Sequence, residues 1–361
     1  MRYQRQIALP EMGQEGQLRL QQARILCVGA GGLGSPVLLY LAGAGVGRIG
    51  VMDADKVALH NLQRQVLYTE ADVGKIKSTT AISHLLALNH DIRYDDFPEF
   101  IHHDNALERL SVYDFILDCT DSIQAKLLLN DACHQLQKPL ISASVEAFRG
   151  QLITILPPNN GCLRCLFPEL TQASMLTRCE TSGVLGVVPG ILGMHQALVV
   201  LKWILQLEEK GLGQVYHFDA LSQRSANYQL EPNPSCILCT KKQNFATLWG
   251  KDLAAKGQLE KHMQSHQITV QELAQKLNNQ ESFFLLDVRN PDEHAQFNIG
   301  GHLVPLTLLP ESLAQIPDDM PIVIYCRSGH RSQLALEFLQ QQGFSDVKNL
   351  IGGVLAWQQA G

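Results

Sequence analysis

A short apolar run, residues 25–28, leads into the glycine-rich segment GAGGLG and then into a helical pattern. The glycines of this segment are Gly29, Gly31, Gly32 and Gly34. Glycines at this spacing let the backbone approach phosphate groups closely, and the N-terminus of the following helix favours their negative charge. The next apolar run ends in Asp53, where a carboxylate can accept hydrogen bonds from a ribose. The segment therefore predicts a nucleotide site, although by itself it fits NAD, FAD or ATP.

The surrounding sequence predicts an α/β fold with a doubly wound, Rossmann-like sheet. Short apolar runs alternate with longer helical patterns as far as about Leu156. The expected strands are Ile25–Val28, Ile49–Met52, Phe115–Leu117 and Leu140–Ser142, and the expected helices are Pro36–Ala44, Lys75–Asn89 and Ile123–Leu136. A final pair of runs, Val215–Leu221 and Ser225–Leu230, predicts a hairpin that closes this domain.

The C-terminal part of the chain predicts a second, small α/β domain. We expect the first domain to span residues 1–245, a polar linker to span residues 246–266, and the second domain to span residues 267–361. The elements expected in the second domain are the helices Thr269–Asn278 and Arg331–Gln341 and the strands Phe283–Val288 and Ile322–Tyr325.

Four of the nine cysteines form two Cys-x-x-Cys pairs, a spacing typical of metal sites. They are Cys162, Cys165, Cys236 and Cys239. Two such pairs can close a tetrahedral Cys₄ zinc site with no open coordination position, which indicates a structural metal. Buried free cysteines or a redox dithiol are the alternative interpretation.

Charge and hydropathy weigh against nucleic acid and membrane partners. The formal net charge is -6 and no run of like charges stands out, so there is little basis for binding a phosphate backbone. The N-terminal residues show no secretory signal. The most apolar stretch, Gly186–Leu207, is long enough to span a bilayer, but Pro189 and several polar residues interrupt it, so we expect a buried helix. The expected location is the cytoplasm.

Charged and polar motifs favour a triphosphate over a dinucleotide. These motifs are Arg2–Gln6, Asp53–Asp55, Asn61–Gln65, Gly74–Lys77 and Asp118–Asp121. A dinucleotide dehydrogenase does not need this many cations near its phosphates, whereas a triphosphate does. In order and spacing, the motifs of residues 1–240 resemble those of the MoeB and ThiF family of adenylating enzymes, bacterial relatives of the ubiquitin-activating enzyme.

This resemblance implies a role for each matching residue. It places Gly32 against the phosphates of ATP, Asp53 on the ribose, and Mg²⁺ on Asp121. The residues that it places around the triphosphate are Asn61, Arg64 and Lys77. Arg5 matches an arginine that in this family reaches into the neighbouring protomer's site, which implies a homodimer. The family also carries the two cysteine pairs, which favours zinc. The implied substrate is a ubiquitin-like sulfur-carrier protein that ends in Gly-Gly.

A further cysteine, Cys179, lies in the polar stretch Leu176–Gly183. A thiol beside Arg178 in such a segment can have a lowered pKa and act as a nucleophile. It matches the crossover-loop cysteine of the family, which can join covalently to the activated carrier or to its sulfur source. A plain loop cysteine is the alternative. The cysteines that fall inside predicted strands or helices, and that we interpret as core residues, are Cys27, Cys119 and Cys133.

Another candidate nucleophile, Cys326, opens the six-residue loop CRSGHR between a predicted strand and a predicted helix. Backbone N–H groups and a helix N-terminus at such a position lower a thiol pKa and stabilise an anion. With LDVR and EH upstream and LIGG and AW downstream, residues 267–361 resemble a rhodanese domain. Related phosphatases have one more loop residue, so this length favours a persulfide carrier, with Arg327 and Arg331 favouring anionic sulfur or its donor. One segment, Gly301–Leu306, departs from the usual Gly-His-Ile-Pro-Gly-Ala pattern.

The two resemblances together imply a bifunctional enzyme. The expected reaction is ATP-dependent adenylation of the carrier's C-terminal glycine, followed by sulfur transfer from a persulfide to form a thiocarboxylate. The implied sulfur donor is thiosulfate or a cysteine desulfurase persulfide. A nicotinamide- or flavin-dependent oxidoreductase that uses the glycine-rich turn is the enzymatic alternative, and a zinc-ribbon protein that binds nucleic acid is the non-enzymatic one. The sequence does not identify the carrier or its pathway, which could be molybdopterin synthesis, thiamine synthesis, tRNA thiolation or the synthesis of sulfur-containing secondary metabolites.

Overall fold

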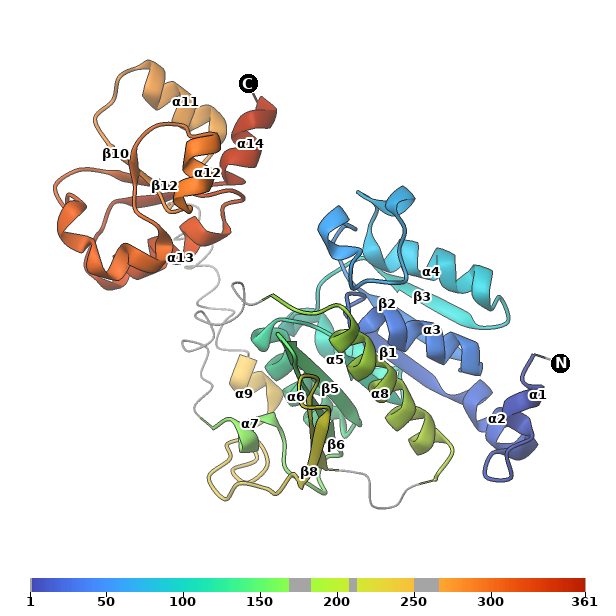
Figure 1. Cartoon of the computed structure of the whole chain (residues 1–361). Helices are drawn as coiled ribbons and strands as arrows, with labels where there is room; N and C mark the ends of the chain where they lie inside the picture. The colour runs from blue at the N-terminus through green and yellow to red at the C-terminus, as the bar shows by residue number, and fades with distance from the viewer. Residues whose placement is uncertain (1, 169–182, 208–212, 250–265, 361) are drawn as a thin grey trace. The chain divides into compact units, whose positions relative to one another are not determined.

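The computed structural model describes residues 2–168, 183–207, 213–249 and 266–360, and it divides into two compact units (Figure 1). The first unit runs from Met1 to Gly250 and the second from Lys251 to Gly361. Each unit has its own sheet and its own hydrophobic core.

The first unit is built on an eight-stranded sheet in the order β3-β2-β1-β4-β5-β6-β7-β8. Its strands are β1 (Arg24–Val28), β2 (Arg48–Met52), β3 (Arg93–Phe97), β4 (Phe115–Asp118), β5 (Leu140–Glu146), β6 (Arg149–Ile155), β7 (Gln214–Asp219) and β8 (Arg224–Gln229). Strands β3, β2, β1, β4 and β5 run parallel to one another. The remaining strands are added by antiparallel pairing, and β7 and β8 form the predicted hairpin.

Helices cover both faces of this sheet. The longer ones are α2 (Gly13–Gln22), α3 (Gly34–Ala44), α4 (Lys77–Leu88), α5 (His103–Ser111), α6 (Ile123–Leu136) and α8 (Val187–Ile204). Alternate residues of β1 point to opposite faces of the sheet. Ile25 and Cys27 pack with α3, α4 and α8 on one face, whereas Leu26 and Val28 pack with α5 and α6 on the other. An uninterrupted apolar run is what a parallel strand buried on both faces requires. The doubly wound α/β prediction is confirmed.

Strands β3 and β6 escape prediction from the sequence. Strand β3 reads RYDDF and lies at the edge of the sheet, so it lacks the apolar run that marks the other parallel strands. Strand β6 follows β5 through a tight turn in which Ala147 has a φ of 51°. No glycine or proline marks this reversal, because Ala147 adopts the left-handed conformation that those signals usually indicate.

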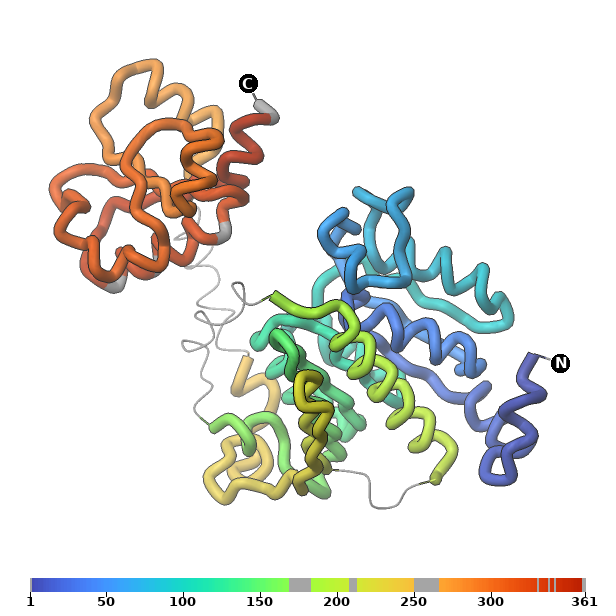
Figure 2. Tube along the Cα trace, viewed as in Figure 1, coloured from blue at the N-terminus to red at the C-terminus, as the bar shows by residue number. Residues whose placement is uncertain are grey.

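Helix α8 is the described helix that is long and apolar enough, by length and composition, to cross a membrane. It packs beside α3 and against β5 (Figure 2). Of its 18-residue apolar segment, 44% is buried. Its buried side includes Val188, Leu192 and Val200. This packing agrees with the core helix expected from the sequence.

The second unit is built on an all-parallel five-stranded sheet in the order β11-β10-β12-β13-β9. Its strands are β9 (Gln267–Ile268), β10 (Phe284–Asp287), β11 (His302–Leu303), β12 (Ile322–Tyr325) and β13 (Val347–Leu350), and its helices are α11 (Val270–Asn278), α12 (Pro291–Gln296), α13 (His330–Gln341) and α14 (Gly353–Ala360). Leu286 and Ile324 face the cluster that contains α13, whereas Leu285 and Val323 face the one that contains α11 and α14.

The polar stretch between the units begins inside a helix. Residues 246–249 belong to α9 (Phe245–Trp249), whose Phe245 and Trp249 are buried in the first unit. Residues 250–265 lie outside the described part of the chain.

Candidate active sites and metal centre

The glycine-rich turn joins β1 to α3, and two of its glycines are required by backbone packing. Gly29 has a φ of +93°, and a Cβ there would lie 2.7 Å from the carbonyl oxygen of Cys119. A Cβ at Gly34 would lie 2.1 Å from the carbonyl oxygen of Gly29. At Gly31 the nearest atom would be 3.6 Å away. A side chain would therefore fit at Gly31 in the described structure, whereas close backbone atoms require glycine at Gly29 and Gly34.

Asp53 follows β2 and connects this strand end to the glycine-rich turn. One carboxylate oxygen accepts a hydrogen bond from the Ala30 N–H at 2.8 Å, and the other accepts one from the Asp55 N–H at 2.9 Å. The carboxylate is nearly buried. Burial raises the pKa of Asp53, against the opposing effect of Lys77. Asp53 thus lies at the turn, where a ribose-binding carboxylate is expected.

The cations predicted to surround a triphosphate border the same turn. Lys77 opens α4, is 6% exposed, and its Nζ lies 3.0 Å from Asp55 Oδ2. A Cβ at Gly32 would lie 3.3 Å from Arg64 Cγ, so the stem of Arg64 lies against the turn. Asn61 is nearly buried in the preceding 3₁₀ turn, Leu59–Asn61.

Tyr68 is a residue of this site that the sequence analysis missed. Its hydroxyl lies 2.9 Å from the carbonyl oxygen of Ala30 and 3.1 Å from that of Lys77. Burial raises the pKa of Tyr68, so the phenol stays protonated and can donate. Tyr68 therefore links the turn to the start of α4. A lone tyrosine between charged motifs carries no sequence signal of such a role.

The segment after β4 brings Asp121 to the carboxyl edge of the sheet. Strand β4 pairs with β1, so its end lies beside the glycine-rich turn. Asp121 itself is exposed. Three residues earlier, Asp118 is fully buried and accepts hydrogen bonds from Lys126 Nζ at 3.0 Å and Ser142 Oγ at 2.5 Å. Both carboxylates belong to one sequence motif, and the structure shows that Asp118 anchors the segment that carries Asp121.

Arg5 is not brought to the turn of its own chain. It lies in α1 (Gln4–Ile7), which docks at the far end of α3: Gln6 Nε2 donates to the Ala44 carbonyl at 2.8 Å. The glycine-rich turn is at the opposite end of this helix. With 11 residues in α3, the two ends are roughly 16 Å apart at 1.5 Å per residue.

The four paired cysteines converge in the first unit. Their Sγ atoms all lie within 4.8 Å of one another, and Cys162 Sγ is 3.8 Å from both Cys165 Sγ and Cys236 Sγ. A tetrahedron with Zn–S bonds of about 2.3 Å has sulfur–sulfur edges of about 3.8 Å. The arrangement therefore fits a tetrahedral thiolate site, and the donor set has no room for a further ligand.

Buried polar groups on α6 hold the first cysteine pair in place. Asn130 Oδ1 accepts from the Leu163 N–H at 2.9 Å, and Asp131 forms a bidentate ion pair with Arg164. Asp131 also accepts from Trp249 Nε1 at 2.8 Å, which ties α9 to the same point.

Cys326 lies at the end of β12, 1% exposed, at the head of a loop that is fixed by backbone contacts. Its Sγ accepts hydrogen bonds from the Gly329 N–H at 3.2 Å and from Ser332 Oγ at 3.4 Å. The carbonyl of Cys326 accepts from the Val354 N–H at 2.9 Å. Donors aimed at the sulfur stabilise a thiolate or persulfide anion there.

Acid–base pairs surround this loop. Arg331 donates to Glu293 through two hydrogen bonds, of 2.7 and 2.6 Å, and this contact lowers the pKa of Glu293 to about 2. Burial alone would raise the pKa of Asp287, but hydrogen bonds from Arg289 and His294 outweigh it and lower the pKa overall. The positive charge of Arg331, expected from the sequence to favour anionic sulfur, is thus offset by a carboxylate.

The atypical segment after Gly300 still forms the strand that closes this sheet edge. Gly301 has a φ of +89°, and β11 pairs with β10 in parallel. The Val304 N–H donates to the Asp287 carbonyl at 2.9 Å.

The remaining cysteine predictions divide into two groups. Cys27, Cys119 and Cys133 are fully or nearly buried, as expected of core residues, and Cys27 Sγ lies 3.7 Å from Cys119 Sγ. Cys179 lies outside the described residues.

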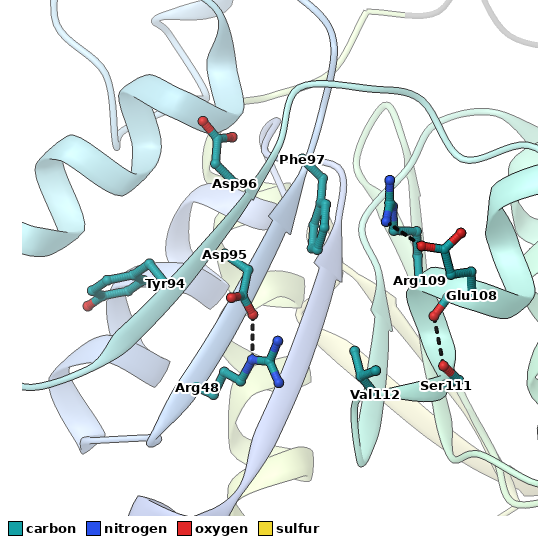
Figure 3. Close-up of a pocket in the computed structure, with 9 residues that line it drawn as sticks. All are labelled: Arg48, Tyr94, Asp95, Asp96, Phe97, Glu108, Arg109, Ser111 and Val112. Atoms are coloured by element: carbon teal, nitrogen blue, oxygen red, sulfur yellow. Dashed lines mark hydrogen bonds and ion pairs between the residues drawn. The ribbon is translucent and has the colours of Figure 1, made fainter.

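A separate pocket lies against the edge strand β3, and its lining includes none of the predicted site residues (Figure 3). Charged side chains in it are already paired: Arg48 with Asp95, and Arg109 with Glu108. We assign no ligand to this pocket.

The chain is a two-domain α/β transferase that combines a glycine-rich strand-to-helix turn with a loop headed by a buried cysteine. The ThiF family model matches residues 3–238, and the rhodanese-like domain model matches residues 269–360. The chain is 37% identical over 378 residues to the adenylyltransferase and sulfurtransferase MOCS3-1 of Zea mays. This alignment covers 99% of the present chain and 81% of the maize protein. It is 36% identical over 368 residues to the probable adenylyltransferase/sulfurtransferase MoeZ of Mycobacterium tuberculosis, covering 99% and 92%.

Among solved structures, E. coli MccB shares the fold with a TM-score of 0.59 at 23% identity, covering 66% of this chain and 73% of that one. The chain belongs to the ThiF family and carries a C-terminal rhodanese-like domain; it is an adenylyltransferase and sulfurtransferase. These comparisons give the oxidoreductase alternative no support.

Proposed function

We propose that the first domain uses ATP and Mg²⁺ to adenylate the C-terminal glycine of a ubiquitin-like sulfur-carrier protein, and that Cys326 supplies the sulfur for its thiocarboxylate. The observation that carries the first half is the gathering of the glycine-rich turn, Lys77 and the Asp118–Asp121 segment at one edge of the sheet. The loop around Cys326 Sγ carries the second half.

Adenylation requires the carrier carboxylate to attack the α-phosphate of ATP while negative charge develops on pyrophosphate. Arg64 and Lys77 supply compensating positive charge without moving protons. Lys77 already holds Asp55, so triphosphate binding would exchange one anionic partner for another. Asp121, exposed beside the turn, would hold Mg²⁺, which screens phosphate charge when bound. The open space at Gly31 leaves the backbone accessible to phosphate oxygens.

We propose that zinc occupies the four-cysteine centre as a structural metal. The chemistry of four thiolates with the spacing of a tetrahedron supports zinc, and the absence of an open position argues against a catalytic role. Cys162, Cys165, Cys236 and Cys239 would hold it.

The working unit that we propose is a homodimer. Helix α8 and its neighbour α3 leave large apolar side chains exposed: Tyr40 by 56%, Val187 by 57% and Leu198 by 53%. A second copy that covers this face would remove it from water. The distance of Arg5 from its own turn is consistent with a role in the neighbouring protomer's site.

We propose that sulfur then passes through thiolate chemistry in the cytoplasm. Cys326 thiolate attacks the sulfane sulfur of a donor, thiosulfate or a desulfurase persulfide, and becomes a persulfide while the donor's sulfite or thiolate leaves. The persulfide attacks the adenylated carboxyl, and AMP leaves. That attack leaves the carrier joined to Cys326 as an acyl disulfide. Cys179 thiolate would then attack the Cys326 sulfur, which releases the thiocarboxylate and leaves a Cys179–Cys326 disulfide for an external thiol to reduce. Alternatively, Cys179 would displace AMP first and hold the carrier as a thioester, from which the persulfide then displaces it.

The test is to incubate the full chain with ATP, Mg²⁺ and each candidate carrier. We expect pyrophosphate release and an acyl-adenylate mass on one carrier, and a thiocarboxylate mass after a sulfur donor is added. Asp121→Ala protein is the matched control. Release of pyrophosphate without any carrier, or hydride transfer to a nicotinamide or flavin, would contradict the proposal.

A further inference from the structure

The loop that begins at Cys326 ends at Arg331, and a carboxylate from outside this loop neutralises Arg331. Its two terminal nitrogens lie 2.7 and 2.6 Å from the two oxygens of Glu293, in a parallel bidentate pair. Both side chains are 28% exposed, so the pair is partly shielded from water. Glu293 is itself fixed, because it caps α12 through the Asn290 N–H at 3.1 Å. A bidentate pair of this kind holds both the position and the charge of the guanidinium.

The neighbouring Arg289 is also paired, whereas Arg327, within the described part of the chain, is not. Arg289 is buried and donates to Asp287, which also contacts His294 Nδ1 at 2.8 Å. Arg327 is exposed, and it has no ion pair with the residues that the structure describes. Its carbonyl accepts from the Leu355 N–H at 3.0 Å, which fixes the backbone beside Cys326. Of the two arginines in the loop, Arg327 is thus the one whose charge no described carboxylate compensates.

Sulfur donors differ in the charge that this loop must accommodate. When Cys326 thiolate attacks thiosulfate, the S–S bond of the donor breaks, a new S–S bond forms, and sulfite leaves with two negative charges. When the thiolate attacks the outer sulfur of a neutral persulfide, R–S–SH, a thiolate with one negative charge leaves. Both steps conserve electrons and need no further oxidant or reductant. Each additional unpaired cation therefore stabilises thiosulfate and the departing sulfite more than it stabilises the neutral persulfide and its singly charged thiolate.

We propose that Glu293 sets the choice of sulfur donor: by neutralising Arg331 it disfavours thiosulfate and leaves the Cys326 loop suited to a persulfide of a thiol. This inference rests on the proposed role of Cys326 as a persulfide carrier. By holding Arg331, Glu293 makes a competing donor less favourable and adds no contact to the preferred one. The residue lies six positions after the end of β10 and outside the loop, where a loop motif alone does not reveal it.

The experiment measures the initial rate at which Cys326 gains sulfur in the full chain, by intact mass after rapid alkylation. Thiosulfate and N-acetylcysteamine persulfide, which has no carboxylate, are the two probes. We expect wild type to favour the persulfide. Glu293→Gln should raise the ratio of kcat/KM for thiosulfate to that for the persulfide by roughly tenfold, as expected for one partly screened charge. The gain should diminish as salt is added.

Three further variants separate charge from shape. Arg331→Gln leaves Glu293 unpaired and should move the ratio in the opposite direction. The double variant Glu293→Gln/Arg331→Gln restores a net charge of zero and should return the ratio to that of wild type. Asp292→Asn removes an exposed carboxylate next in sequence and should leave the ratio unchanged.

An unchanged ratio in Glu293→Gln, or an equal change for both donors, would overturn the inference, because Glu293 would then only shape the loop. If wild type gains sulfur on Cys326 from neither probe, the proposed carrier role fails, and the inference fails with it. If Glu293→Gln does not fold, Arg331→Gln and the double variant carry the same comparison, and equal ratios in both would overturn it.

Discussion

Two aspartates at the end of β4 have opposite environments, and they predict opposite effects of mutation. Asp121 is exposed, so Asp121→Ala should preserve the fold but abolish carrier-dependent pyrophosphate release if Asp121 holds Mg²⁺. Asp118 is fully buried against Lys126. Asp118→Ala should therefore lower the free energy of unfolding by roughly 3–5 kcal/mol, because it leaves a buried charge unpaired. Pyrophosphate release and denaturant unfolding check both; normal release by Asp121→Ala would remove Asp121 from the site.

The depressed pKa of Glu293 predicts how acid weakens the second unit. Its pKa is lowered to about 2 in the folded chain by the contact with Arg331, against about 4.3 in an unfolded chain. A carboxyl group with a lowered folded pKa contributes stability above its unfolded pKa and loses it as the pH falls through the folded value. The Tm difference between wild type and Glu293→Gln should have its full size near pH 6 and should shrink as the pH falls from about 4.3 toward 2. A difference that stays constant over this range would contradict the ion pair.

At the scale of elements, the cysteine centre is a small cluster held by α6, α7 (Leu163–Leu166) and α9. We expect one zinc ion per chain, and we expect Cys162→Ser or Cys239→Ser to lower Tm more than it lowers activity per folded molecule, because structural metal binding is part of the folding free energy. Cys133→Ser is the matched control, since Cys133 is a buried cysteine outside the cluster. Metal analysis and thermal unfolding give the result. Well-folded, freshly purified protein without zinc would rule out a structural metal.

The elements that the sequence predicts are those whose burial shows in an apolar pattern. Strands β1, β2, β4 and β5 are buried on both faces and were predicted within a few residues, whereas the edge strand β3 reads RYDDF and was not. Glycine spacing located the turn, and cysteine spacing located the metal cluster. Side-chain pairing across elements has no local signature. The contacts of Tyr68, Asp118 and Glu293 therefore became visible only when the fold placed their partners beside them.

For the whole molecule, a site shared between two protomers predicts complementation. Arg5→Ala and Asp121→Ala should each lose carrier-dependent adenylation, since each removes one half of every site. In a mixture, a hybrid dimer holds one site with both groups intact. Random exchange at equal amounts in a two-fold dimer should restore about a quarter of the wild-type sites. Pyrophosphate release after mixing is the measurement, and mass spectrometry of differently tagged chains verifies exchange. Proven exchange without recovery would exclude sharing in trans.

The division of the chain into two compact units predicts that its two chemistries separate. Cys326→Ser should eliminate thiosulfate-dependent sulfur transfer and thiocarboxylate formation, because serine cannot form a persulfide. Adenylation should stay near normal, because Asp53, Lys77 and Asp121 lie in the other unit and none of them uses a thiol. Ser332→Ala is a graded companion variant: it removes one of the two hydrogen bonds to Cys326 Sγ and should slow sulfur loading without abolishing it. Pyrophosphate release and the mass of the carrier report the two steps in one reaction mixture. If Cys326→Ser protein still makes thiocarboxylate from thiosulfate at the normal rate, the sulfur does not pass through the rhodanese-like domain.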